Sequence, residues 1–139
     1  MPPKRSKKWS TLQLAKEIAR LADEKLAENI VVLDVGQAIQ VADYFVVADG
    51  KNGRHINSVV ESVASSLKKE GIYRIGGSPL HDENWVLLDF GPVVLHVFNP
   101  RSRAFYDLEN LWGDCKRIRW QAPVRRAETD AETNGAATG

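Results

Sequence analysis

The chain has 139 residues, one cysteine and a formal net charge of +1 from 19 basic and 18 acidic side chains. The length is that of one domain, the lone cysteine excludes an intrachain disulfide, and no apolar run approaches the ~20 residues of a membrane span. The near-neutral total hides a split, because residues 1–10 carry +4, residues 116–139 carry +2 and the part between them carries −5. An acidic body is poorly suited to a phosphate backbone and well suited to a basic protein partner.

Residues 1–9 combine Pro, Lys and Arg with one Trp and are expected to form a flexible basic arm. They contain no apolar signal region, so we expect a cytoplasmic protein. Ser10 is followed three residues later by Gln13, which is the spacing of a capping box and predicts the start of a helix. Apolar residues at helical spacing extend this helix over 11–28 and include Leu26 in its apolar stripe.

Two short apolar runs, 30–33 and 44–48, come next along the chain. They show no polar alternation, which is typical of strands buried on both faces. A second amphipathic helix is predicted over 54–70, with Gly71 as a favourable residue for ending it. The apolar face of this helix should cover the sheet.

Three more strands and a helix complete the predicted elements. The short run 72–75 predicts a third strand, and the runs 85–90 and 93–98, joined by a Gly-Pro pair, predict a hairpin. Pro100 then marks the start of a helix over 100–112, because proline is favoured at the first helical position.

The order of these elements predicts the fold class. Helices and strands alternate, yet the hairpin requires antiparallel neighbours, so we expect an α/β fold with a mixed five-stranded sheet flanked by helices. One domain is expected over 10–118. Residues 119–139 show no apolar periodicity and are expected to form a disordered tail.

Three carboxylates near predicted strand ends, Asp34, Asp43 and Asp89, could hold Mg²⁺ for phosphoryl transfer. The chain lacks the D-x-D pair and the phosphate loop of nucleotidyl transfer, so turn and cap roles for Asp34 and Asp43 are favoured. The three histidines have no metal-ligand spacing. His96, between two apolar residues of a strand, is interpreted as half-buried or on the surface. We therefore predict no catalytic residue, no metal site and no cofactor.

The hairpin carries the most informative pattern. Strand alternation places Trp85, Leu87 and Asp89 on one face, and both faces are apolar apart from Asp89 and His96. Aromatic side chains with a few charges are typical of protein interfaces and are also common in cores. The pattern leaves both alternatives open: the two faces are covered within the domain, or one of them meets a partner.

Four blocks of sequence resemble those of one family. They are ADYFVVA at 42–48, WVLLDFG at 85–91, VVLHVF at 93–98 and FYDLENLW at 105–112. In this order and at these separations they resemble the signature blocks of the RsfS (iojap) family of ribosomal silencing factors, and the resemblance extends over about residues 11–118. The turn Gly91-Pro92 departs from the more usual Gly-Asp.

The resemblance implies a mixed α/β domain like that of nucleotidyltransferases, without their catalytic residues. It implies binding to the large ribosomal subunit through its fourteenth ribosomal protein, which blocks joining of the small subunit and represses translation when nutrients are scarce. It also implies a homodimer when free, and the basic ends would add a weak attraction to ribosomal RNA. Two alternatives stay open, a nucleotidyltransferase-like enzyme and a ribosome-assembly factor that contacts RNA.

Carried over block by block, the resemblance nominates the hairpin and the last helix as the binding face. The tryptophans would supply apolar anchor area, and the two acids would meet basic side chains of the ribosomal protein. The histidine and the tyrosine would hydrogen-bond across the interface or fix their neighbours. The nominated residues are Trp85, Leu87, Asp89, His96, Tyr106, Glu109 and Trp112.

Overall fold

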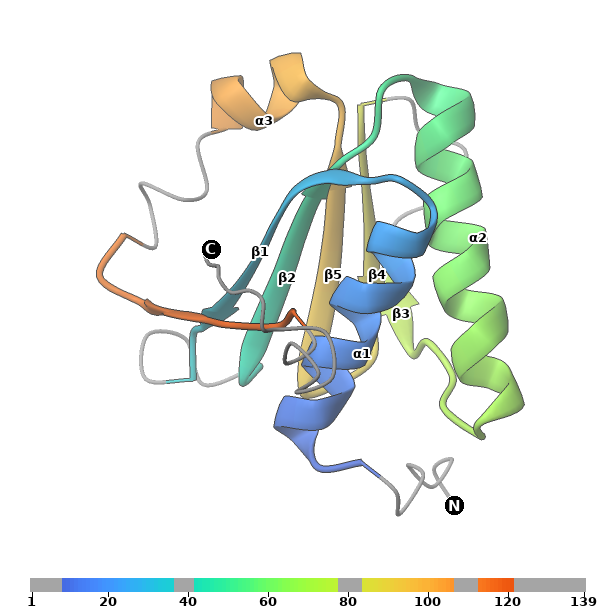
Figure 1. The fold of residues 1–139 in the computed structure, drawn as a ribbon, viewed down its shortest axis with the longest axis vertical. Helices are drawn as coiled ribbons and strands as arrows, with labels where there is room; N and C mark the ends of the chain where they lie inside the picture. Colours follow the sequence, from blue (N-terminus) through green and yellow to red (C-terminus); the bar gives the residue numbers. More distant parts are fainter. Residues whose placement is uncertain (1–8, 37–41, 78–83, 107–112, 122–139) are drawn as a thin grey trace, which may run out of the picture.

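The computed structural model describes residues 9–36, 42–77, 84–106 and 113–121, with the backbone alone described at 104–106. A six-stranded sheet has helices on both of its faces (Figure 1). The strands are β1 (Glu28–Asp34), β2 (Tyr44–Asp49), β3 (Gly76–Gly77), β4 (Trp85–Asp89), β5 (Val93–Phe98) and β6 (Lys116–Ile118). Their order is β3-β4-β5-β2-β1-β6. Since β2 and β5 pair in parallel and the other neighbours antiparallel, the predicted mixed sheet is confirmed.

The edge strand β3 differs from the strand predicted at 72–75. Pairing with β4 occurs instead at Gly76–Gly77. Gly77 has a φ of +125°, and a Cβ atom there would clash with the carbonyl oxygen of Leu87, so this close approach depends on glycine. Ile72 is buried in the core, and its amide N–H donates to the last turn of the preceding helix. The run that was predicted to be a strand therefore begins by closing a helix.

At the opposite edge, β6 is a sixth strand, so the prediction of five strands is wrong. It pairs antiparallel with β1, with Ile118 opposite Val32. Two of its three residues are exposed cations, so no apolar run marks it in the sequence. Just beyond it, Trp120 packs against the core, and its indole Nε1 donates to the carbonyl oxygen of Ile30 at 3.2 Å.

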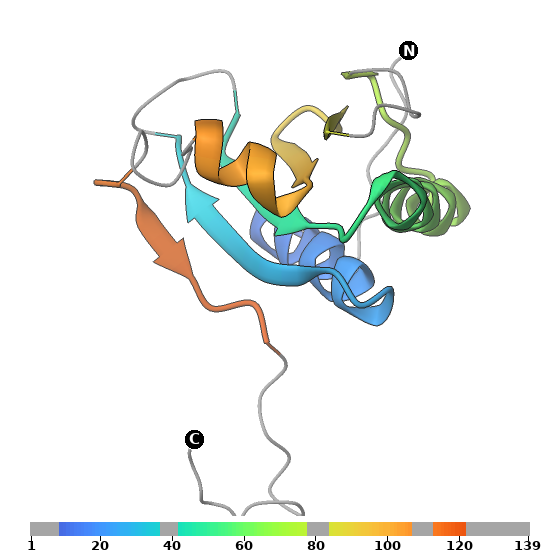
Figure 2. The ribbon, with the colours of Figure 1, turned by 90° about the horizontal axis from the view of Figure 1, so that it is seen from above.

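Three helices flank the sheet, α1 (Thr11–Glu24), α2 (Gly53–Lys69) and α3 (Pro100–Tyr106). The helices α1 and α2 cover one face, and α3 lies over the other (Figure 2). The predicted capping box is confirmed, because Ser10 Oγ accepts from the Gln13 amide at 3.1 Å and the Ser10 amide donates to Gln13 Oε1 at 2.8 Å. No helix of the described ranges is long and apolar enough to cross a membrane.

The end of α1 lies at Glu24, so the prediction that it extends to residue 28 is wrong. The Leu26 amide donates to the Asp23 carbonyl at 2.8 Å and the Ala27 amide to the Ala22 carbonyl at 3.1 Å. This pair of bonds is a Schellman motif, which reverses the chain direction. Leu26 occupies the left-handed position with a φ of +67° and is 69% exposed, so it is not part of the apolar stripe.

The bounds of α2 lie within a residue of the predicted helix 54–70, and Gly71 follows with a φ of +80°. The last predicted helix, 100–112, is a helix as far as Tyr106. Residues 107–112 lie outside the described ranges.

Apolar side chains pack on both faces of the sheet. The larger core lies between α1, α2 and the face that they cover. We call the opposite face the second face, and its buried apolar side chains come mainly from β1, β2 and β5. They include Leu33, Phe45, Val47, Val94 and Phe98.

The predicted arm and tail fall mostly outside the described residues, which exclude 1–8 and 122–139. The two tryptophans at their inner ends, Trp9 and Trp120, pack against the larger core.

Leu26→Gly should stabilise the protein by about 0.5–1 kcal/mol. The left-handed conformation costs an L-residue roughly 1–2 kcal/mol, and the extra flexibility of unfolded glycine offsets about half of that gain. Urea denaturation followed by circular dichroism measures the change. Leu26→Ala is the matched control, because it removes the same exposed side chain and keeps the Cβ atom. Equal stability of the two variants would contradict the prediction.

Candidate functional site

The candidate site is the part of the second face formed by β4 and β5. The register pairs Trp85 with Phe98 and Leu87 with His96, so these four side chains lie on one face. The intervening Val86 is buried in the core under the helices, which confirms the predicted alternation. Trp85 and Leu87 are only half-buried. The hairpin therefore presents partly exposed apolar area on the second face.

Aromatic rings from three strands hold one another in place at this site. The Trp85 and Phe98 rings stack with their centroids 4.9 Å apart, and the Phe45 and His96 rings meet edge to face with their centroids 4.6 Å apart. The Trp85 and His96 rings lie 5.9 Å apart. Such offset and edge-to-face contacts fix ring orientation more closely than aliphatic packing does. The exposed part of Trp85 is thus held in one orientation by buried neighbours.

His96 is buried, with 4% of its surface exposed, so its interpretation as half-buried or on the surface is wrong. Its Nδ1 accepts a hydrogen bond from the indole Nε1 of Trp85 at 3.2 Å. An accepting Nδ1 places the ring proton on Nε2, which is buried without a hydrogen-bond partner in the described structure. Burial lowers the pKa of His96 to about 4, because a charged imidazolium would lose its hydration. His96 is a neutral ring that orients Trp85.

Acidification should destabilise the fold through His96. The folded pKa of about 4 lies below the unfolded value of 6.5, so the unfolded chain binds the proton first. Stability is complete above pH 6.5 and is lost as the pH falls from 6.5 to 4, with about 2 kcal/mol lost between pH 7 and pH 5.

Denaturation midpoints at intervals between pH 7 and pH 5 measure this slope. His96→Gln should flatten it, because the Gln side-chain oxygen can accept from the Trp85 indole and does not titrate. A His96→Gln variant with the slope of the wild-type protein would refute the assignment.

Asp89 has a structural partner at the tip of the hairpin. Its Oδ1 accepts from the amide of Gly91 at 2.8 Å, and Gly91 has a φ of +95°. The side chain thereby closes the turn that precedes Pro92. It is half-buried at the end of β4, so the same carboxylate can hold the turn and face a partner.

The remaining nominated residues lie at the end of α3 and in the segment after it. Tyr106 is the last residue of this helix, and its side chain is not described. Glu109 and Trp112 lie outside the described residues. The structure therefore brings together four of the seven nominated residues, which are Trp85, Leu87, Asp89 and His96.

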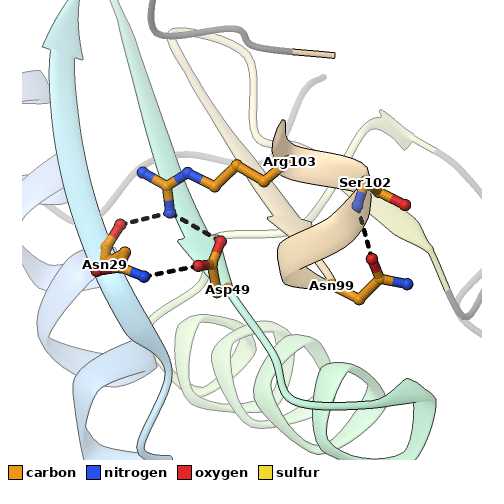
Figure 3. Close-up of polar contacts among 5 residues, drawn as sticks. All are labelled: Asn29, Asp49, Asn99, Ser102 and Arg103. Carbon is orange, nitrogen blue, oxygen red and sulfur yellow. Dashed lines mark hydrogen bonds and ion pairs between the residues drawn. The ribbon is translucent and has the colours of Figure 1, made fainter. Parts of the chain in front are cut away.

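A buried polar network fastens α3 to the sheet (Figure 3). The Nη1 of Arg103 donates to Asp49 Oδ1 at 2.9 Å and to the carbonyl oxygen of Asn29 at 2.6 Å. The other oxygen of Asp49 accepts from Asn29 Nδ2 at 2.8 Å. These residues lie on α3, β2 and β1, and no motif in the sequence marks the network because its members are 20 and 54 positions apart.

A second set of polar contacts holds the beginning of α3. Asn99 Oδ1 accepts from the amide of Ser102 at 2.8 Å, which caps the helix. The side-chain amide of Asn99 donates to Asn84 Oδ1 at 2.9 Å, next to the start of β4. The short helix is therefore tied to the sheet at its start and again one turn later.

Two of the three carboxylates considered for a magnesium site accept local hydrogen bonds. Asp34 Oδ1 accepts from the amide of Gly36 at 3.3 Å, and Asp89 closes the hairpin turn. Burial raises the pKa of the Tyr44 hydroxyl, and repulsion from Asp34 and Asp43 adds to this rise. Within the described ranges, no group of three or more His, Cys, Asp or Glu side chains is placed to hold a metal ion.

Comparison with known proteins identifies related chains. The family model described as "Ribosomal silencing factor during starvation" matches residues 8–138. The ribosomal silencing factor RsfS of Bacillus subtilis is 35% identical over 102 residues, which is 73% of this chain and 86% of that protein. The chloroplastic protein Iojap of Arabidopsis thaliana is 30% identical over 108 residues, covering 78% of this chain and 45% of that protein. A crystal structure from Chromobacterium violaceum superposes with a TM-score of 0.73 at 30% identity, covering 76% of this chain and 88% of that one.

Proposed function

The chain belongs to the RsfS/Iojap family of ribosomal silencing factors, and on that premise we propose that it represses translation by docking the second face of its sheet on the large ribosomal subunit. As a member of this family it is a silencing factor and not an enzyme. The observation that carries the proposal is the half-exposed apolar area of Trp85 and Leu87, held on a rigid sheet and left uncovered by α1 and α2.

The docking partner is the fourteenth protein of the large subunit, at the surface where the small subunit joins. Silencing then needs no bond chemistry, because a domain that occupies this surface excludes the small subunit sterically. A standard interface takes ~800 Å² from each partner, which one sheet face and a short helix can supply. The charge of −5 over residues 11–115 favours a basic protein as this partner.

Each nominated residue has a distinct part in this interface. Trp85 and Leu87 provide apolar anchor area, and His96 acts from beneath by fixing the Trp85 ring. Asp89 faces a basic side chain of the partner while it closes its own turn. The residues that follow in sequence extend the interface from α3. They are Tyr106, Glu109 and Trp112.

The proposal also covers the two ends of the chain and the oligomeric state of the unbound protein. The binding domain spans 10–118, and the free protein forms a homodimer. The basic arm adds a weak attraction to nearby ribosomal RNA. Part of the basic charge of the C-terminal end belongs to the sheet, because Lys116 and Arg117 lie on β6.

Trp85→Ala should weaken binding to isolated large subunits by about 30-fold, since loss of a central aromatic anchor costs roughly 2 kcal/mol. Asp89→Asn should weaken it by about fivefold, because the Asn oxygen still accepts from the Gly91 amide and only the charge is lost. Co-sedimentation through sucrose gradients over a range of protein concentrations gives both affinities.

The matched control for the charge is Glu61→Gln, on the exposed side of α2 away from the second face. It should leave binding unchanged. Wild-type protein that stays at the top of the gradient in the presence of large subunits would overturn the proposed function. An equal loss from the Glu61 and Asp89 variants would overturn the choice of face.

Removing residues 1–8 should leave binding intact at high salt and make its salt dependence shallower. This segment carries four positive charges, and phosphate contacts appear as the slope of log affinity against log salt concentration. Trp9 is kept because it packs on the core. Removal of residues 122–139, with a net charge of −1, is the control and should leave the slope unchanged. Complete loss of binding without residues 1–8 would favour an RNA-binding arm over the sheet face.

A further inference from the structure

Arg103 and Asp49 form a deeply buried ion pair, with 8% and 3% of their surfaces exposed. One nitrogen of the guanidinium serves both Asp49 and the Asn29 carbonyl, and both carboxylate oxygens of Asp49 are bonded (Figure 3). Buried charges are tolerated only when they are fully partnered in good geometry. The pair therefore tolerates little displacement of α3 relative to β1 and β2.

The helix that carries Arg103 depends on such contacts. With seven residues α3 is much shorter than the helices that are stable by themselves in water. Asn99 ties its start to Asn84 beside β4, and Arg103 ties its next turn to the ends of β1 and β2. Because two separated anchors on different strands define a line, they fix the direction of α3 as well as its location.

The backbone conformation of Asn29 also contributes to the contacts of Arg103. Asn29 has a φ of +52° and lies within a register shift between β1 and β2, so its carbonyl oxygen is available to Arg103. Apolar groups of similar volume would often serve stability as well as a buried ion pair, or better. The polar network supplies orientation in addition, because its bonds are directional.

We infer that Arg103 is a positioning residue for ribosome binding: its contacts with Asp49 and Asn29 set the direction of α3 across the second face. The C-terminal end of α3, at Tyr106, is thereby held at a fixed place relative to β1 and β2. This inference rests on the proposed function. It predicts that affinity for the large subunit depends on Arg103, which is buried inside the domain and does not itself contact the ribosome.

The test is the double variant Asp49→Asn, Arg103→Met. It removes both charges, so no unpaired charge is left buried, and the new Asn can still accept from Asn29 Nδ2. Co-sedimentation with isolated large subunits should show at least a tenfold loss of affinity per folded molecule. Val59→Ala, in the core under α2, is the control for lost stability, and it should bind like the wild-type protein at a temperature where it is folded.

A second variant keeps the test decisive if the double variant does not fold. Asn99→Ala loosens the other anchor of α3 without touching a buried charge, and it should weaken binding about threefold or more. If wild-type protein binds and the α3 variants bind equally well, the positioning role is wrong and the proposed function stands. If wild-type protein itself does not bind, the proposed function fails.

Discussion

The parallel pairing of β2 with β5 at the centre of the sheet determines the layout of everything around it. Parallel neighbours cannot be joined by a tight turn, so the chain between them crosses over one face, and α2 is part of that crossover. The helix α1 fills the rest of the same face. With both long helices on one side, α3 is the only helix of the described ranges that lies over the second face (Figure 2). The half-exposed apolar side chains of the hairpin are a consequence of this distribution.

Local sequence patterns predict much of this fold. The capping box at Ser10, the doubly buried strand β2 and the left-handed Gly71 each depend on residues close together in the chain. The predictions of the end of α1 and of the number of strands failed, and each failure has an identifiable cause. Leu26 takes a conformation that glycine normally takes, so the apolar pattern of α1 extends past its actual end. The strand β6 is defined by its neighbour β1 and not by its own residues.

The candidate site shows the same division between local pattern and tertiary contact. Alternation along β4 is enough to place Trp85 and Leu87 on one face. The burial of His96 is a different matter, because it depends on rings from β2 and β4 that close over it in space. The network of Arg103, Asp49 and Asn29 joins three elements far apart in sequence, and a charged residue in a helix is ordinarily read as part of a solvated surface. Residues with exposed apolar area were thus easier to single out from the sequence than the buried polar residues that hold α3.

The two edge strands of the sheet affect how readily the protein aggregates. A protein that displays apolar area on a sheet risks strand addition at any open border, where unpaired backbone groups act as a template for another chain. One border here is the two-glycine strand β3, which is too short to recruit a partner strand. The other is β6, with Lys116 and Arg117 exposed on it. Both described borders therefore discourage fibre-like growth by backbone pairing between copies of the chain.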